Sequence, residues 1–518
     1  MSEKGQNQYF IVINLGLRSV RVIVFDDKAQ KLWHGWHPVE TIVGADQVEQ
    51  NAEDWWNKAE SLLKDAVHNI SELKDSELYL SVTGSSSCLI PVDSSGKAIY
   101  NSIMVSDKRA TKEALKLEER YPHHFAAKDE FLPLASYLMP KILWFKNNEP
   151  SLHKKVFKYL SPNDFLIYKL TGRYITDDLN AHKFYFHEKY NIFFDEILSH
   201  FNLGKELFPE VVRCGNIVGP TTPDVVSKTG ISKNSKVILT TYDALCAFWG
   251  TGVAQEGDSS NVVGTVSSLR TLSNKRKKFK SNLLSQEFLL FNKFVVGGSN
   301  NLDGGLMEWA KEAFYEDAAK DDSIYKLMEE EATHSTVGAR GLLFMPYLLG
   351  ERAPFWDTEV RGLFFGIEKF HRREDFIRSV YESSAFMITD MLNEIEKSGL
   401  QVSNIKLSGG FAKSELGSML RADVTGKEIH LLAEEESTAL GSCLISMFTL
   451  NLIDLNGLKD IVKIRKIVTP EKVHHEQYQK LYALFKELYN STKNLHLLRK
   501  DVQSDILSGD ERYILKNL

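Results

Sequence analysis

Three short segments rich in glycine and hydroxyl residues follow candidate strands in this sequence. They are Gly16–Ser19, Gly264–Ser268 and Gly409–Gly410. Turns of this kind expose backbone N–H groups that can bind an anion such as phosphate. Each one alone is also typical of an ordinary tight turn, but three of them at strand ends favour phosphate binding. None has the G-x-x-x-x-G-K-S/T spacing, which excludes a P-loop.

Asp243 is the main candidate for proton transfer. It follows a predicted strand at 236–240 and precedes a small-residue helix that begins at Ala244. A carboxylate at such a junction can face a cleft and act as a general base. The alternative is a helix N-cap, a common role of aspartate. Asp107 and Arg109 could contact a polyhydroxylated ligand, and a surface ion pair explains them equally well.

The elements that must position these residues alternate between strand and helix patterns. Continuous apolar runs bounded by turn residues predict buried strands, and an apolar stripe at helical spacing predicts a helix. The first half contains predicted strands at 9–13, 20–25, 31–35 and 77–82 and a helix at 53–69. The second set contains strands at 236–240, 260–263 and 405–407 and helices at 244–251, 436–450 and 475–489.

Both sets open with strands that end in Gly, Ser or Thr turns, and strands that alternate with helices indicate α/β layers. The sequence therefore predicts two similar α/β domains, residues 1–254 and 255–518, with an active cleft between them. No linker rich in Pro or Ser marks this division.

Composition narrows the class of protein. The 518 residues are 43% hydrophobic and 25% charged, which is typical of a chain with a proper core. The net charge of −6 disfavours generic nucleic-acid binding, and the basic run at 274–280 is predicted to be a solvated loop. Apolar runs too short to span a bilayer, a polar start and four scattered cysteines predict a cytoplasmic protein with reduced, buried thiols and no membrane partner.

One ordered series of motifs in the second half is the most specific feature of the chain. It consists of Gly350–Asp357, Arg361–Ile367, Asp375-Phe376 and Ser379–Glu382. Shorter matches occur at Lys141–Trp144, Asp164–Leu166, Leu170–Gly172, Gly409–Ser414 and Ala422–Val424. By these residues the chain resembles the FGGY carbohydrate kinase family, from about residue 9 to about residue 490.

The resemblance implies a fold and an activity. The fold is that of two actin/hexokinase-like, ribonuclease H-like domains. The first would carry the sugar side, the first phosphate loop and the catalytic aspartate; the second would carry the nucleotide side and a C-terminal helical tail. The activity is transfer of the γ-phosphate of ATP, with Mg²⁺, to a sugar hydroxyl that Asp243 deprotonates as general base. A homodimer is compatible with the resemblance.

The resemblance also implies roles for individual residues. The sugar side is assigned to Ser86, Asp107 and Arg109, together with Asp243. The metal site is assigned to Asn14 and Asp243. The ATP site is assigned to Gly16, Arg18, Arg21, Gly264, Thr265, Gly304, Gly410 and Ser414.

The first phosphate loop departs from the D-x-G-T pattern of the family. Asn14 replaces an acid that helps to hold hydrated Mg²⁺, and Leu17 replaces a hydroxyl that faces phosphate. A neutral amide is a weaker partner for a hard cation. Arg18 and Arg21 could compensate by contacting phosphate directly, because guanidinium pairs well with phosphate oxygens.

Departures on the sugar and nucleotide sides leave the substrate open. Ser85–Cys88, Val105, Gly417 and Met419 replace residues that are frequent in the family. A ketopentose such as xylulose or a sugar acid such as gluconate is the expected substrate, and the autoinducer-2 kinase branch remains open. The alternative is a catalytically weakened relative that acts as a sugar- or nucleotide-binding regulator. Asn14 and Leu17 motivate that alternative, and the retained Asp243 and Thr265 argue against it.

Overall fold

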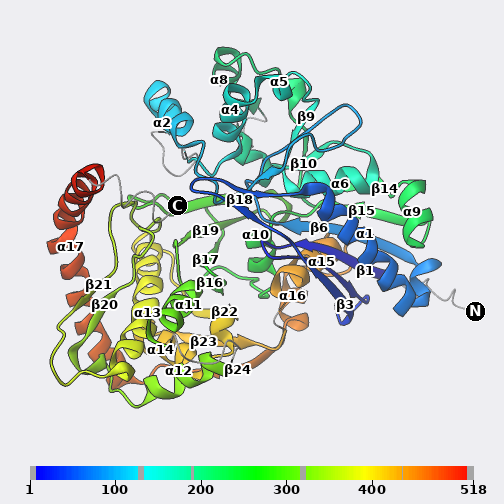
Figure 1. The fold of residues 1–518 in the computed structure, drawn as a ribbon. Helices are drawn as coiled ribbons and strands as arrows, with labels where there is room; N and C mark the ends of the chain where they lie inside the picture. Colours follow the sequence, from blue (N-terminus) through cyan, green and yellow to red (C-terminus); the bar gives the residue numbers. More distant parts are fainter. Residues whose placement is uncertain (1–7, 126–133, 188–191, 316–322, 435, 510–518) are drawn as a thin grey trace, which may run out of the picture. The chain divides into compact units, whose positions relative to one another are not determined.

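The computed structural model describes residues 8–125, 134–187, 192–315, 323–434 and 436–509 (Figure 1). The chain forms two compact units. The first unit comprises residues 1–254, 287–293 and 436–462, and the second comprises residues 255–286, 294–435 and 463–518. A segment from late in the sequence therefore completes the core of the first unit.

A six-stranded sheet forms the centre of the first unit, with the order β14-β15-β6-β1-β2-β3. The strands are β1 (Gln8–Leu15), β2 (Ser19–Phe25), β3 (Lys31–Pro38), β6 (Glu77–Gly84), β14 (Ile217–Pro220) and β15 (Ser235–Ile238). Strand β1 pairs antiparallel with β2 and parallel with β6, and β6 pairs parallel with β15. The carboxyl ends of β1 and β6 therefore lie at the same edge of the sheet.

Helices cover both faces of this sheet. Helix α1 (Ala52–Asn69) packs on β2 and β3, with α6 (Pro162–Thr171) and α9 (Pro223–Thr229) against it. Helices α10 (Asp243–Trp249) and α15 (Ser437–Thr449) pack against each other, and α15 also contacts β1 and β6. The Oγ atoms of Ser81 in β6 and Ser442 in α15 are 2.8 Å apart, which places Ser81 on the α15 face of the sheet.

Smaller elements complete the first unit. The remaining helices are α2 (Thr111–Arg120), α3 (Pro122–Phe125), α4 (Leu138–Asn148), α5 (Pro150–His153), α7 (Asp178–Ala181), α8 (Asp195–His200) and α16 (Leu455–Ile461). The remaining strands are β4 (Ile42–Val43), β5 (Val48–Gln50), β7 (Ile90–Val92), β8 (Ser102–Ile103), β9 (Lys158–Leu160), β10 (Ile175–Asp177), β11 (Phe186–His187), β12 (Ile192–Phe193) and β13 (Glu210–Val212).

The second unit repeats the central arrangement of strands. Its sheet has the order β18-β19-β17-β16-β22-β23-β24. The strands are β16 (Asp258–Val263), β17 (Ser267–Ser273), β18 (Leu284–Phe288), β19 (Lys293–Ser299), β22 (Asn404–Gly409), β23 (Glu428–Leu432) and β24 (Ile464–Val468). Strand β16 pairs antiparallel with β17 and parallel with β22, as β1 does with β2 and β6. The prediction of two similar α/β domains is thus confirmed.

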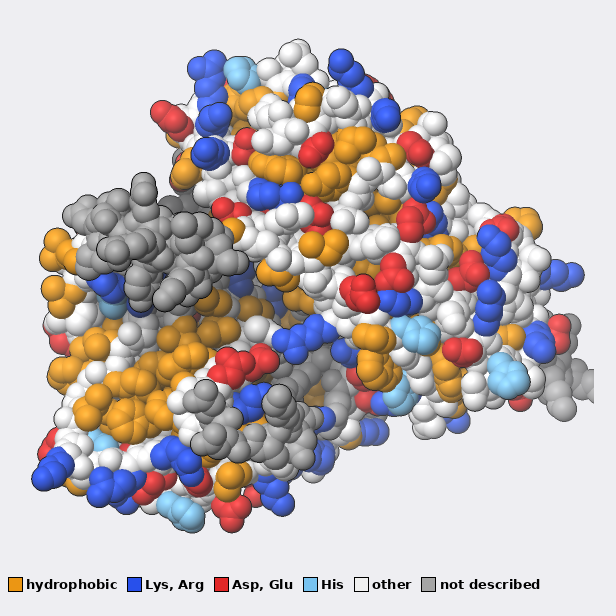
Figure 2. Space-filling model, in the orientation of Figure 1, with side chains coloured by type: hydrophobic (Ala, Val, Ile, Leu, Met, Phe, Trp, Pro, Cys, Tyr) orange, Lys and Arg blue, Asp and Glu red, His pale blue; other side chains and the backbone are white. Residues whose placement is uncertain are grey.

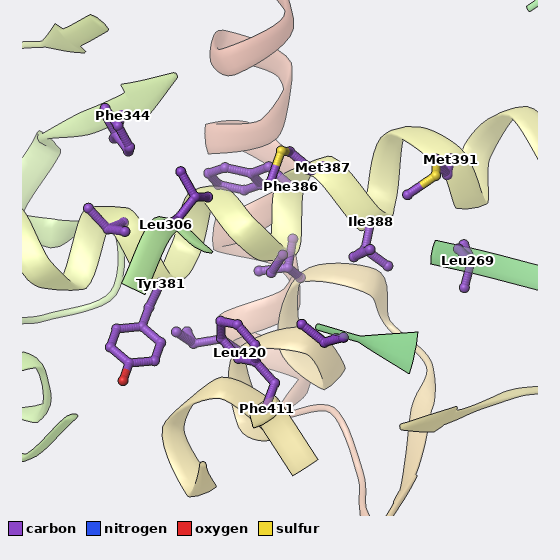
Figure 3. Packing of buried hydrophobic residues seen from close by; sticks show 14 of the residues in the cluster. Leu269, Leu306, Phe344, Tyr381, Phe386, Met387, Ile388, Met391, Phe411 and Leu420 are labelled. Carbon is purple, nitrogen blue, oxygen red and sulfur yellow. The ribbon is translucent and has the colours of Figure 1, made fainter. Parts of the chain in front are cut away.

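The core of the second unit is built around its long helix α13 (Arg373–Lys397). Figure 3 shows Phe386, Met387, Ile388 and Met391 spaced along α13, with Phe411 and Leu420 packed in the same cluster. The other elements are α11 (Gly304–Phe314), α12 (Ser323–Thr333), α14 (Glu415–Thr425), α17 (Lys472–Gly509), β20 (Leu343–Met345) and β21 (Leu363–Phe365).

The structure extends or confirms the other expectations from sequence. The helix predicted at 475–489 runs over Lys472–Gly509, because no proline or glycine interrupts it before its end. All four cysteines are buried and free. Among the described residues, no helix combines the length and the apolar character needed to cross a membrane. Figure 2 shows basic and acidic side chains interspersed on the face in view, in keeping with the modest net charge of −6.

Candidate functional site

The first phosphate loop is the tip of the β1–β2 hairpin. The N–H of Gly16 donates to the carbonyl of Ser19 at 3.0 Å, which closes the turn. Leu17 and Arg18 are exposed at the tip. The carbonyl of Leu17 accepts a hydrogen bond of 2.8 Å from Nε2 of the buried Gln50. The loop is therefore held from below while its tip remains accessible.

Arg21 points to an acid of the same unit. Its Nη1 lies 2.9 and 3.0 Å from the two carboxylate oxygens of Glu436, and its Nε donates to Ser19 Oγ at 3.1 Å. Glu436 precedes α15, so this pair ties the hairpin to that helix. The guanidinium is about 40% exposed and so has a side open to an anion.

Asn14 lies two residues before the turn, near the end of β1, and is buried. It stands opposite Thr83 of β6, and alternation along the strands places both on the same face as Ser81, the face covered by α15. The side chain of Asn14 is thus directed below the loop, where the acid of the D-x-G-T pattern would be.

Asp243 is the first residue of α10 and is half-buried. Its Oδ1 accepts the N–H of Ala244 at 2.7 Å, which fixes the orientation of the carboxylate. The N-cap of α10 is Tyr242, and no side chain caps this end. The N-cap interpretation of Asp243 is therefore wrong, because the helix begins one residue earlier than that role requires.

The serine-rich loop after β6 contains Ser86, which is half-buried. Lys141 of α4 holds this loop: its Nζ donates to the carbonyls of Ser87 at 2.5 Å and of Met104 at 2.7 Å. Lys141 is fully buried, and burial lowers its pKa to about 8. Sequence reasoning gave Lys141 no role; the available signal was a single lysine within the apolar run 138–145.

Asp107 and Arg109 bind each other. The carboxylate of Asp107 accepts from the N–H of Val48 at 2.8 Å and from Nη2 of Arg109 at 2.7 Å. Arg109 also donates to Glu49 at 2.7 Å and stacks on Trp144 at 4.3 Å. Asp107 is 2% exposed, so the alternative of a surface ion pair is wrong: the pair is inside the unit. Its charges hold β5 and α4 together around the loop that Lys141 binds.

Three buried acids of the first unit, Asp164, Asp177 and Asp178, interact with one another. Burial, reinforced by neighbouring Asp178, raises the pKa of Asp177 to about 7. Burial raises the pKa of Asp164 to about 6. Asp177 accepts hydrogen bonds from the N–H groups of Leu179 and Asn180, which shows that it organises α7.

The second phosphate loop is the tip of the β16–β17 hairpin, where Gly264 and Thr265 are exposed. The start of α11 supports it from below. The N–H of Gly304 donates to the carbonyl of Gly264 at 3.1 Å, and the N–H of Gly305 donates to that of Thr265 at 3.1 Å. A Cβ at Gly304 would lie 2.2 Å from the Gly264 carbonyl oxygen, so this approach requires glycine.

Gly410 and Ser414 lie between β22 and α14. Gly410 begins the short helix η6 (Gly410–Ala412), and a Cβ built on it would meet nothing within 4 Å. Ser414 is the N-cap of α14 and accepts the N–H of Gly417 at 2.8 Å. Gly410 faces open space and Thr265 is exposed, so both positions are accessible to a ligand.

The structure thus brings the assigned residues together in two sets. Asn14, Gly16, Arg18, Arg21, Ser86, Asp107, Arg109 and Asp243 belong to the first unit, and Gly264, Thr265, Gly304, Gly410 and Ser414 belong to the second. Among the described residues, no group of three or more His, Cys, Asp or Glu side chains is placed to hold a metal ion. Asn14 and Asp243, the residues assigned to the metal, offer one amide and one carboxylate. Such a pair fits a Mg²⁺ ion that keeps several waters and is bound largely through nucleotide phosphates.

Comparisons with known proteins match nearly the whole chain. The model of the N-terminal domain of the FGGY family of carbohydrate kinases matches residues 9–250, and the model of the family's C-terminal domain matches residues 260–450. The xylulose kinase of Bacillus subtilis is 25% identical over 96% of this chain and 100% of its own length. The gluconokinase of Bacillus licheniformis is 24% identical over 94% and 96%. A ligand-bound xylulose kinase from Lactobacillus acidophilus shares the fold, with a TM-score of 0.86 and 23% identity over 94% of this chain and 98% of that one.

Proposed function

The chain belongs to the FGGY family of carbohydrate kinases, which are ATP-dependent phosphotransferases, and we propose on that premise that it phosphorylates a ketopentose or a sugar acid. The observation that supports this choice is that xylulose kinases and gluconokinases are among the relatives aligned over more than nine-tenths of the chain. A glycerol kinase also aligns over 93% of the chain, which is a reason to test polyols beside these sugars. None of these names supports the alternative of a non-catalytic regulator.

Asp243 serves as the general base in this proposal. Its carboxylate accepts the proton of the attacking sugar hydroxyl as the oxygen forms its bond to the γ-phosphorus of ATP, and ADP leaves with the electron pair of the broken bond. The hydrogen bond from Ala244 orients the carboxylate before substrate arrives. A fixed base contributes to the rate because no reorientation is needed during the reaction.

The sugar side is formed by Ser86 and its neighbours. Ser86 offers a small hydroxyl on a loop whose shape depends on Lys141. We assign Asp107 and Arg109 a place in the wall of this site, where they act through the loop and strands that they hold. A wall of small hydroxyl groups accommodates a polyhydroxylated substrate without a bulky obstruction.

We assign phosphate binding to the two hairpin tips and adenosine binding to Gly410 of η6 and to Ser414. Gly16, Arg18 and Arg21 would contact phosphate from the first unit, and Gly264, Thr265 and Gly304 would do so from the second. Gly410 and Ser414 would border adenosine. Mg²⁺, when bound with ATP, neutralises charge on the β- and γ-phosphates, and Asn14 and Asp243 are the residues assigned to its water shell.

The decisive experiment measures ADP release from Mg·ATP with a panel of ketopentoses, polyols, sugar acids and autoinducer-type diones. One compound is expected to stimulate release, and Asp243→Asn is expected to reduce that stimulated rate by roughly 10²- to 10⁴-fold. Asp224→Asn is the matched control, because this exposed acid in α9 forms a surface ion pair with Lys228. The activity of this variant should equal that of the wild type.

If no compound of the panel stimulates ADP release by the wild type while ATP still binds, the proposal is contradicted and the alternative of a non-catalytic regulator is favoured. An equal rate in the Asp243→Asn variant would refute the assignment of the base while leaving the kinase activity in place.

A further inference from the structure

The guanidinium of Arg421 lies inside the second unit and is 1% exposed. Its Nη2 donates to Asp303 at 2.9 Å and to Ser384 Oγ at 2.9 Å, and its Nε donates to Oδ1 of Asn261 at 2.9 Å. The Cζ atom of Arg421 lies over the ring of Phe411, 3.9 Å from its centroid. Arg421 thus contacts β16, α13, η6 and the residue that precedes α11.

We propose that Arg421 is a positioning residue for the nucleotide site, which holds the Gly264–Thr265 loop, the start of α11 and η6 in one arrangement. This inference rests on the proposed function insofar as these segments bind ATP. The groups that Arg421 contacts are not themselves assigned to ATP, so its effect is transmitted through Asn261, Asp303 and Phe411.

The connection through Asn261 reaches the hairpin that carries Gly264 and Thr265. With Oδ1 occupied by Arg421, the Nδ2 of Asn261 donates to Ser267 Oγ at 2.8 Å and to the carbonyl of Ser268 at 3.0 Å. Because the oxygen of the amide accepts from the guanidinium, its nitrogen must face β17. Arg421 thereby decides the orientation of the side chain that spans the base of this loop.

The connection through Asp303 reaches the same loop from the other side. The N–H of Asp303 donates to the carbonyl of Thr265 at 2.9 Å, next to the bonds that Gly304 and Gly305 make. The carboxylate of Asp303 accepts from both Arg421 and Ser384. A buried acid with these donors keeps its backbone in place beneath the loop.

The third contact concerns the assigned adenosine side. Phe411 lies between Gly410 and Ala412 in η6, and its ring makes a cation–π contact with the guanidinium of Arg421. Figure 3 shows Phe411 and Leu420 as parts of the core cluster beside α13. Loss of the cation would leave the ring without the group that it stacks on, so Gly410 would lose its support.

The second unit contains a matched control for this arrangement. Arg378 and Glu382 form a second buried ion pair at 2.8 Å, with side chains 6% and 1% exposed. Arg378 also donates to Tyr478 of α17 at 2.9 Å. This pair holds α13 to α17, and neither Glu382 nor Tyr478 belongs to a segment assigned to ATP.

The test compares Arg421→Met with Arg378→Met in the full chain. ADP affinity is measured by calorimetry, the KM values for ATP and for sugar by ADP release, and stability by thermal melting. Both variants are expected to melt earlier than the wild type. Arg421→Met should weaken ADP binding and raise the KM for ATP by about tenfold or more while the KM for sugar stays within about twofold, since small displacements of binding groups are costly. Arg378→Met should keep ADP affinity within about twofold of the wild type.

ADP affinity of Arg421→Met within twofold of the wild type would overturn the inference, as would an equal loss in Arg378→Met. If Arg421→Met does not fold, Arg421→Met combined with Asp303→Leu removes both charges, and near-normal ADP binding by that variant would also overturn it. A wild type that binds ADP but shows no sugar-dependent turnover would refute the proposed function alone, and the ADP comparison would still decide the role of Arg421. A wild type that does not bind ADP would overturn the inference.

Discussion

Single residues of the first phosphate loop decide how this chain departs from its family. Asn14 is buried below the hairpin tip, whereas Leu17 and Arg18 are exposed on it. Arg21, two residues beyond the turn, is paired with Glu436. The positive charge of the loop therefore coexists with a neutral amide at the position where the D-x-G-T pattern has an acid.

The Asn14→Asp variant tests whether the neutral amide at position 14 weakens the binding of Mg²⁺. The variant is expected to lower the Mg²⁺ concentration that gives half-maximal activity by roughly tenfold, because a carboxylate attracts hydrated Mg²⁺ more strongly than an amide does. Activity is measured across a Mg²⁺ titration at fixed ATP. Asn216→Asp, which adds the same charge at an exposed site of the first unit, should leave the titration unchanged. An unchanged titration for Asn14→Asp would remove metal placement as the reason for the substitution.

A close approach of helices α10 and α15 in the first unit positions Asp243, the proposed general base. Helices α10 and α15 cross where Gly250 faces Ser437 and Gly441 faces Cys246. The Cβ of an alanine at Gly441 would lie 1.7 Å from the Cys246 carbonyl oxygen. Since Asp243 is the first residue of α10, the packing of this helix on α15 fixes where the carboxylate lies.

Gly441→Ala is therefore expected to destabilise the protein by roughly 3 kcal/mol, because the backbones must separate to admit the methyl group. Urea unfolding measures the loss, and the sugar-dependent rate should fall with it as α10 moves. Thr438→Ala, at a half-buried position in the same helix, should change the unfolding free energy by less than about 1 kcal/mol. Equal stability of Gly441→Ala and the wild type would show that the two helices are not locked by this contact.

At the scale of the whole molecule, the two units are built on the same order and direction of central strands. In each unit, the first hairpin of the sheet ends in one of the loops assigned to phosphate. The boundary between a sugar-side and a nucleotide-side domain at 254/255 stays a prediction from sequence. The compact first unit also includes residues 287–293 and 436–462.

Ligands should therefore protect different units from hydrogen exchange. ADP is expected to slow exchange mainly around 264–265, 303–305 and 410–417 of the second unit. The sugar identified by the panel is expected to slow exchange mainly around 85–88 and 104–109 of the first unit, because each ligand lowers local opening where it binds. Mass-spectrometric exchange with each ligand alone measures this. ADP protection confined to the first unit would contradict the assignment of the nucleotide side.

The family, the α/β class, the repeat of strand patterns and the turns at strand ends could all be predicted from the sequence. These features follow from local periodicity and from ordered motifs, which are properties of short stretches of sequence and do not depend on distant contacts. The sequence did not reveal that Lys141 would hold the loop after β6, that Asp107 and Arg109 would be a buried pair, or that Arg421 would join Asn261 to Asp303. Those partners are separated by up to 160 positions along the chain, as Arg421 and Asn261 are. Only tertiary packing decides which buried donor meets which acceptor, because a desolvated charge must find its partner wherever the fold places one.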